Sequence, residues 1–108
     1  MTTKHLLAIG LSIAAISVVS AADVKENWDK QCLKCHGPDG KGQTKLGKKS
    51  EVKDLTDPKV QAAFTDEKAF KSIKEGLKDG DKTKMKPAEK ITDEEIKALV
   101  AYVRTFKK

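Results

Sequence analysis

Two cysteines and a histidine lie close together in the segment WDKQCLKCHGPDGKG, which begins at Trp28. The chain of 108 residues holds only two cysteines and two histidines. Cys32, Cys35 and His36 therefore gather both thiols and one of the two imidazoles of the protein into one short segment. Thiolates and imidazoles bind metals and react covalently, so this segment is the first candidate for chemistry.

Three of the chemistries open to this segment leave part of it unexplained. A disulfide between Cys32 and Cys35 would close a very short loop, and the stabilisation expected from loop closure shrinks with loop length. A thiol–disulfide oxidoreductase motif usually lies beside a βαβ pattern, which the chain does not show. A zinc site requires four ligands, and this segment supplies three. A carboxylate or water could complete the zinc site. A disulfide would leave His36 without a role.

Covalent attachment of haem is the interpretation that uses all three residues. C-x-x-C-H is the attachment motif of c-type haem, in which two thiols add across the vinyl groups of the macrocycle. We therefore predict that Cys32 and Cys35 form thioethers and that His36 binds the iron from the proximal side. The predicted cofactor is one covalent haem c with its iron, and the disulfide and zinc sites are kept as alternatives.

The second axial ligand of the iron is expected at Met85. This methionine lies in the polar segment KTKMKPAEK, without apolar neighbours, which is an unusual place for a methionine that fills a core. A thioether ligand raises the reduction potential of haem iron. Three lysines of the same segment could replace the sulfur once they are deprotonated, namely Lys82, Lys84 and Lys86.

The first 22 residues are typical of a secretory signal peptide. Lys4 and His5 precede the apolar run LLAIGLSIAAISVVSAA, and Ser20 and Ala22 fit a cleavage site that leaves Asp23 as the new N-terminus. An uncleaved anchor is the alternative, because the run lies near the ~17-residue lower limit for a membrane span. Export predicts a periplasmic protein that is soluble after cleavage and has lost its other histidine.

Residues 23–108 offer little apolar material for a core of their own. Charged residues make up 35% of the chain and aromatic residues 5%, so a domain of this size is expected to be marginal without a disulfide, metal or other bound partner. A haem would supply the missing core. The formal net charge of +6 comes from lysines interleaved with acids, a pattern that does not favour nucleic-acid binding.

The apolar pattern predicts helices and no strands, so the expected fold class is all-α. Residues spaced by four predict a helix from Val24 to about Leu33. The following residues 37–55 contain four glycines without an apolar period and are expected to form a loop. A short helix is predicted in TDPKVQAAF, because Asp57 can cap it and Pro58 suits its first position.

Two more helices are predicted towards the C-terminus. DEKAFKSIKEG has acids in its first turn and a glycine at its end, which is typical of a helix. LKDGDKTKMKPAEK, which contains Met85, is expected to be irregular. The last helix has a capping box at Thr92 and Glu95, and apolar residues follow at helical spacing.

These motifs, in this order, resemble the class I monohaem c-type cytochromes of the small bacterial periplasmic kind. The resemblance covers residues 23–108 and rests on CLKCHG, on Met85 followed by Pro87, and on the closing helix ALVAYVRTF. It implies a cytochrome c domain over residues 23–108, with three to five helices wrapped around haem. Trp28, Leu99 and Tyr102 match positions that pack the crossing of the first and last helices in that family.

Two positions depart from the family pattern. Val24 stands where the family often has a glycine, which implies a looser or shifted crossing of the first and last helices. Lys48 stands where many relatives have a proline whose carbonyl accepts a hydrogen bond from the proximal histidine. The partner that orients His36 is therefore not assigned by the sequence.

The function expected from these residues and the resemblance is that of a soluble periplasmic electron carrier and not an enzyme. Its iron would cycle between ferrous and ferric states with both axial positions filled. The expected partners of the monomer are redox proteins with acidic docking surfaces, such as an oxidase, a reductase or a peroxidase. The lysines expected to steer these encounters are Lys41, Lys45, Lys48, Lys49, Lys82, Lys84 and Lys86. A gas sensor or weak peroxidase is the alternative if Met85 is readily displaced.

Overall fold

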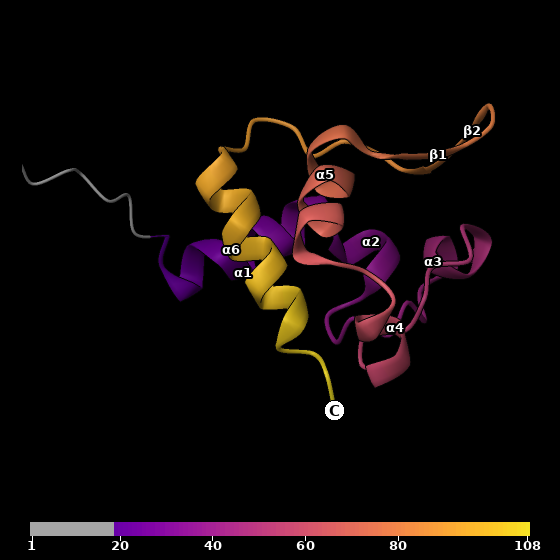
Figure 1. The fold of residues 1–108 in the computed structure, drawn as a ribbon, viewed down its shortest axis with the longest axis horizontal. Coiled ribbons are helices and arrows are strands. Elements are labelled where there is room, and N and C mark those ends of the chain that lie inside the picture. Colours follow the sequence, from indigo (N-terminus) through magenta and orange to yellow (C-terminus); the bar gives the residue numbers. More distant parts are fainter. Residues whose placement is uncertain (1–18) are drawn as a thin grey trace, which may run out of the picture.

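The computed structural model describes residues 19–108, which form six helices and one antiparallel hairpin (Figure 1). The elements in chain order are α1 (Ala21–Gln31), α2 (Leu33–His36), α3 (Lys45–Lys49), α4 (Pro58–Ala62), α5 (Asp66–Glu75), β1 (Leu77–Asp79), β2 (Lys82–Met85) and α6 (Asp93–Arg104). Helices dominate the described residues, in agreement with the predicted all-α class.

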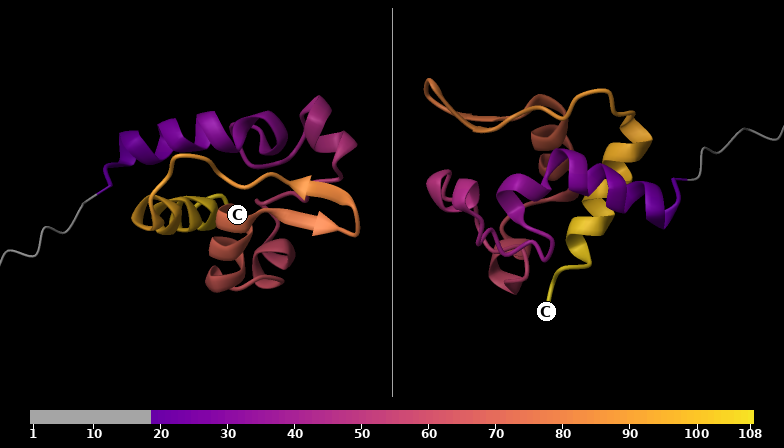
Figure 2. Two further views of the ribbon diagram at one scale, coloured as in Figure 1. Left: turned by 90° about the horizontal axis from the view of Figure 1, so that it is seen from above. Right: turned by 180° about the vertical axis from the view of Figure 1, so that it is seen from behind.

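The helices form two layers. Seen from above, α1, α2 and α3 lie along one side of the molecule, and α4, α5 and α6 lie along the other (Figure 2). Helix α6 packs against both α1 and α5. The buried apolar residues come mainly from these three helices and are Val24, Trp28, Cys32, Ile73, Ile96, Leu99, Val100 and Val103. The helical spacing predicted for the last helix therefore identifies its core face.

The capping signals of the sequence are confirmed. Thr92 Oγ1 accepts from the backbone N–H of Glu95, and the Glu95 carboxylate accepts from the backbone N–H of Thr92, as a capping box requires. Asp57 caps α4 through the N–H of Lys59, and Pro58 is the first helical residue. These local bonds satisfy N–H groups that a helix start leaves unpaired.

Helix α1 begins inside the segment predicted to be removed. Ser20 caps it by accepting a hydrogen bond from the N–H of Asp23 at 3.2 Å. Cleavage after Ala22 would remove this cap and the first two helical residues. Residues 1–18 lie outside the described residues, so the division into a signal peptide and a domain from residue 23 stays a prediction. No helix within residues 19–108 has the length and apolar character that a membrane span requires.

The prediction of an irregular segment after α5 is wrong for residues 77–85, which form the β1–β2 hairpin. Asp79 pairs with Lys82, so Gly80 and Asp81 make a two-residue turn, in which Gly80 has a φ of +60°. Gly-Asp is a typical sequence of two-residue hairpin turns, and it is the signal that the periodicity missed. The strands are mostly exposed and carry no alternating apolar pattern. Figure 1 shows the hairpin projecting from the helical body.

The predicted loop over residues 37–55 contains one short helix, so that prediction is wrong for residues 45–49. Thr44 caps α3 by accepting from the N–H of Gly47 at 2.8 Å. Gly47 is buried, and a Cβ at this position would collide with the carbonyl oxygen of Cys35. The glycine therefore allows α3 to lie directly against the backbone of α2.

Candidate cofactor site

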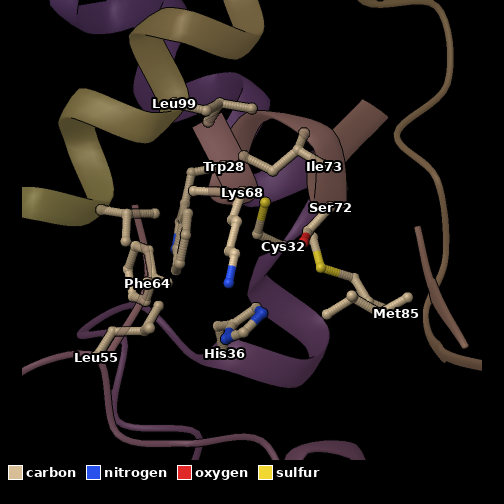
Figure 3. Close-up of a pocket in the computed structure, with 13 residues that line it drawn as sticks. Trp28, Cys32, His36, Leu55, Phe64, Lys68, Ser72, Ile73, Met85 and Leu99 are labelled. Atoms are coloured by element: carbon tan, nitrogen blue, oxygen red, sulfur yellow. The ribbon is translucent and has the colours of Figure 1, made fainter. Parts of the chain in front are cut away.

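An apolar cavity opens between α2, α5, the hairpin and the α1–α6 core (Figure 3). It contains about 710 Å³ of space without protein atoms, counting the part open to solvent. The lining residues are Trp28, Cys32, His36, Leu55, Phe64, Lys68, Ala69, Ser72, Ile73, Leu77, Met85, Leu99 and Val103.

Three of the four predicted site residues line this one cavity. Cys32 lies at the end of α1, His36 is the last residue of α2, and Met85 is the last residue of β2. Cys35 is half-buried on α2 and is not among the lining residues. The fold thus brings the attachment segment and Met85 to the lining of one cavity.

The attachment segment is fixed by hydrogen bonds on both sides. Within it, the N–H of His36 donates to the carbonyl of Cys32 at 2.9 Å, so one helical turn places the histidine beyond the cysteines. Thr44 Oγ1 donates to the carbonyl of Cys35 at 2.9 Å. Trp28 Nε1 donates to the carbonyl of Gly37 at 3.0 Å, and this bond is buried. The neighbours of His36 are therefore held from α1 and from the segment before α3.

Trp28 also joins the site to the core. Its ring centroid lies 5.7 Å from that of His36, 5.6 Å from that of Tyr102 and 5.0 Å from that of Phe106. Trp28 is 1% exposed and Leu99 is fully buried. The packing at the α1–α6 crossing is the role that the family resemblance implies for these residues. The crossing therefore forms a wall of the cavity.

Met85 is placed by the end of α5. Gly76 ends this helix with a φ of +80°, and a Cβ there would lie 2.6 Å from the carbonyl oxygen of Met85. The N–H of Ala88 donates to the carbonyl of Ile73 at 2.8 Å. On the outer side, Lys84 Nζ lies 3.7 Å from a carboxylate oxygen of Glu51. The segment around Met85 is thus tied to α5 by its backbone.

Burial changes the pKa values of two of the predicted site residues, His36 and Cys32. Burial lowers the pKa of His36, so the imidazole stays neutral and can bind a metal ion. Its Nδ1 is buried and has no hydrogen-bond partner among residues 19–108. Within the described part of the chain, therefore, no carbonyl oxygen takes the place of the proline carbonyl that many relatives have at the position of Lys48. Burial, with a smaller contribution from Cys35, raises the pKa of the Cys32 thiol to about 12, which does not suit a reactive thiolate.

The donor set fits haem better than the alternatives. Both thiols are free, so the structure contains no Cys32–Cys35 disulfide. Within residues 19–108 no group of three or more His, Cys, Asp or Glu side chains could hold a zinc ion. A planar apolar macrocycle, in contrast, needs a large apolar space with one imidazole and one further donor. The cavity offers this combination in His36 and Met85.

Lys68 and Ser72 also line the cavity and were not singled out by the sequence. Both lie on α5 and are four residues apart, so they share a face of that helix. A helical plot of α5 places both residues near Ile73, and this position could have indicated that they face the cavity. Leu55 and Phe64 were also missed as lining residues, because nothing in a loop sequence shows which of its apolar residues turn inward.

Comparison with known proteins confirms the predicted cytochrome c fold. The model of the Cytochrome c family matches residues 21–107, and the chain belongs to the cytochrome c family. Three solved chains match, among them the KustC0563 c-type cytochrome, at 39% sequence identity and a TM-score of 0.68. That match covers 78% of this chain and 96% of the other. No curated protein matches this chain. Membership implies a covalently bound c-type haem with iron and a function in haem-based electron transfer.

Proposed function

We propose that this chain is a soluble periplasmic carrier of single electrons with one haem c, and that it is not an enzyme. The observation that carries the proposal is the joint position of Cys32, His36 and Met85 on a single apolar cavity. Cys32 and Cys35 would hold the haem as thioethers, and His36 and Met85 would be the axial ligands.

Each group of residues has a defined part in this mechanism. When bound, the haem supplies an iron that changes between the ferrous and ferric states. The neutral imidazole of His36 would bind this iron, and the thioether of Met85 as the other ligand would raise the reduction potential. Apolar walls from Ile73 and Leu99 exclude water, and low polarity around the iron also disfavours the more highly charged ferric state. With both axial positions occupied, no substrate would bind the iron.

The proposed docking surface is the side of the molecule that carries α3 and the hairpin. Leu46 on α3 is 45% exposed and Leu77 on β1 is 47% exposed. Exposed lysines surround them on the same elements, namely Lys45, Lys48, Lys49, Lys78 and Lys82. This arrangement supports transient encounters with acidic redox proteins, in which charge steers the approach and a small apolar contact forms at the centre.

Absorption spectra and potentiometry of the matured, exported protein test the proposed ligands. Sharp low-spin bands, together with the weak long-wavelength sulfur–iron band in the oxidised form, are expected. One haem per chain is expected from iron and pyridine-haemochrome analysis. A spectrum with haem but without the sulfur–iron band would show that Met85 is not the axial ligand, and a protein without haem would exclude the proposal.

Charge reversal tests the docking surface. The double variant Lys48→Glu, Lys49→Glu should slow electron exchange with an acidic redox protein, by roughly tenfold or more at low salt, because steered association depends steeply on charge. Lys97→Glu on α6 is the matched control, since α6 lies away from α3 (Figure 1). Equal effects of the two changes, or rates that do not depend on salt, would place docking elsewhere.

A gas-binding or weak peroxidase function is the second candidate. It is favoured by the projecting hairpin, whose strands are largely exposed and which carries Met85 at its end. If the hairpin moved away, the sixth position would open. Binding of carbon monoxide to the ferrous protein at micromolar concentrations, without denaturant, would favour this function over electron transfer.

A further inference from the structure

The plane of the His36 imidazole is not set by a hydrogen bond. A histidine that binds a metal almost always donates its other ring N–H to a carboxylate, a carbonyl or water, and this bond fixes the orientation of the ring. The buried Nδ1 of His36 has no such partner among residues 19–108. Another contact must therefore hold the imidazole in the orientation that ligation requires.

Helix α3 occupies the position from which many relatives supply the orienting carbonyl. Lys48, the residue at that position, donates its N–H to the carbonyl of Thr44 at 2.9 Å, and its own carbonyl accepts from the N–H of Glu51 at 3.3 Å. A proline lacks the N–H that the first of these bonds uses. Local helix formation thus engages both peptide groups of Lys48 and leaves His36 to be oriented by other means.

Backbone hydrogen bonds fix the main chain of His36 but not its ring. The N–H of His36 donates to the carbonyl of Cys32 at 2.9 Å, and its carbonyl accepts from the N–H of Gly42 at 2.9 Å. Rotation about the side-chain torsion angles changes neither of these bonds. The plane of the imidazole is therefore decided by what the ring packs against.

The ring of Trp28 is the contact that can decide this plane. Its centroid lies 5.7 Å from that of His36, with 41° between the two planes. Among the aromatic pairs of the described residues, only this one includes His36. Rings with centroids about 4.5–7 Å apart prefer offset or tilted arrangements, so such a contact restricts the angle between them. Figure 3 shows the indole reaching along the cavity towards the imidazole.

Trp28 is itself fixed on several sides. Its Nε1 donates to the carbonyl of Gly37, the residue directly after His36, at 3.0 Å. Its ring centroid lies 5.6 Å from that of Tyr102 and 5.0 Å from that of Phe106, and the side chain is 1% exposed. The indole cannot turn without breaking a buried hydrogen bond and disturbing this packing. It is therefore a rigid surface for the imidazole to pack on.

We propose that Trp28 is the positioning residue of the proximal ligand, and that its ring sets the plane of the His36 imidazole in place of a hydrogen bond from Nδ1. This inference rests on the proposed function, since it takes His36 as a ligand of haem iron. An imidazole whose N–H has no acceptor is a weaker electron donor than one that donates a hydrogen bond. The arrangement therefore raises the reduction potential, in the same direction as the thioether of Met85.

The test changes the indole and, separately, loosens the same helix crossing elsewhere. Trp28→Leu removes both the flat ring and the N–H, whereas Trp28→Phe keeps a flat ring. Val100→Ala is the matched control, because Val100 is buried on α6 but does not line the cavity. Guanidinium titrations of the haem-loaded proteins measure how much stability each change removes.

The haem methyl resonances in the proton NMR spectrum of ferric protein with bound cyanide report the imidazole plane. Cyanide replaces the sixth ligand, so Met85 does not contribute to their spread. These resonances should shift in Trp28→Leu, shift less in Trp28→Phe, and keep their wild-type positions in Val100→Ala. Shifts as large in Val100→Ala as in Trp28→Leu would mean that Trp28 acts only through the helix crossing, and would overturn the proposal.

The reduction potential gives a second readout with a defined sign. Loss of the indole should let water accept a hydrogen bond from Nδ1 of His36, which strengthens the imidazole as a donor. The potential should therefore fall in Trp28→Leu and stay at the wild-type value in Val100→Ala. A scalar coupling across a hydrogen bond from Nδ1 to a carbonyl carbon, in isotope-labelled wild-type protein, would show that a carbonyl orients the ring and would overturn the role of Trp28.

The outcomes separate this inference from the proposed function. A wild-type protein without haem or without the sulfur–iron band contradicts the His36/Met85 site itself. A wild-type protein with that band, whose methyl resonances do not move in Trp28→Leu, contradicts only the role of Trp28. If Trp28→Leu does not mature with haem, Trp28→Phe is compared with Val100→Ala, and unchanged resonances in Trp28→Phe then overturn the proposal.

Discussion

The two axial ligands proposed for the iron lie in regions that are built in different ways. His36 is held beside the α1–α6 crossing, where Trp28 and Leu99 are almost completely buried. Met85 ends a hairpin whose strands are largely exposed and whose outer ion pair lies at the surface. Free energies of local opening are lowest where few apolar contacts are buried. The proximal side should therefore open only with global unfolding, and the distal side on its own.

The largest effect is expected where the crossing itself is broken. Trp28→Ala would remove a buried ring that contacts Tyr102 and Phe106. It would also leave the carbonyl of Gly37 with only the long hydrogen bond from the N–H of Gly40 at 3.4 Å. Substitutions of this kind cost about 3–5 kcal/mol. We expect the unfolding free energy of the haem-loaded protein to fall by this amount in guanidinium titrations.

Trp28→Phe separates the two contributions of this residue. It keeps an apolar ring but loses the N–H, so the expected cost is smaller: about 0.5–1.5 kcal/mol for the lost hydrogen bond to Gly37, with a further loss from the smaller side-chain volume. A Trp28→Ala protein of wild-type stability would mean that haem, and not the helix crossing, holds this side of the cavity together.

A somewhat smaller effect is expected at Gln61, which joins α4 to the end of α6. Its Nε2 donates to the carbonyls of Leu55 and Val103, and its Oε1 accepts from Arg104 at 2.9 Å. Gln61 is 3% exposed. Gln61→Ala would remove these three hydrogen bonds. The carbonyl of Val103 would keep the N–H of Phe106 at 3.2 Å, but the carbonyl of Leu55 would lose its donor, at a cost of about 1–3 kcal/mol. The same titrations measure it, with exposed Lys59→Ala on α4 as the control expected to change little.

Gln61 also shows where sequence reasoning ends. Helix starts were predictable because caps such as Thr92 and Glu95 act over three residues, and the core face of α6 followed from helical spacing. The bond from Gln61 to Val103 joins residues distant in sequence, and no local pattern encodes it. Nothing in the composition of a polar helix distinguishes a buried glutamine from an exposed one.

The same limit decided which residues of the candidate site could be predicted from the sequence. Cys32, Cys35 and His36 are adjacent in sequence, so their spacing was enough to predict a cofactor. Met85 was predicted from its scarcity and its polar surroundings, and the cavity places it near His36. Lys68 could not be selected, because the chain has many lysines and only the packing of α5 turns this one inward. The hairpin was missed because its turn signal lies in Gly80-Asp81, which periodicity does not detect.

A pH dependence is expected from the contact between α1 and α6. Asn27 Nδ2 donates to the Glu95 carboxylate at 2.8 Å, and this bond, followed by those from Thr92, lowers the pKa of Glu95. A lowered folded-state pKa contributes stability above the ordinary glutamate pKa of 4.5. That contribution is lost as the pH falls through the folded pKa. Acidification below about pH 4.5 should therefore destabilise the crossing.

Glu95→Gln tests this dependence, because an amide can still accept from Thr92 but does not titrate. The loss of unfolding free energy between neutral and acidic pH should be smaller in Glu95→Gln than in the wild type. Glu94→Gln, at an exposed position of the same helix, is the control and should keep the wild-type slope. Identical slopes in all three proteins would assign the acid sensitivity to other groups.

The smallest effect on stability is expected at Glu51, and it tests whether the hairpin is independent of the core. Glu51→Gln removes the ion pair with Lys84, in which the Glu51 side chain is 79% exposed. Exposed pairs contribute about 0–1 kcal/mol, so the global unfolding free energy should hardly change. Release of Met85 should become easier, and imidazole should bind the ferric protein up to about fivefold more tightly, as 1 kcal/mol allows. High salt should remove this difference, because it screens the pair.

A loss of global stability as large as that of Gln61→Ala would mean that the hairpin unfolds with the core. The two sides of the cavity would then not differ in the way proposed.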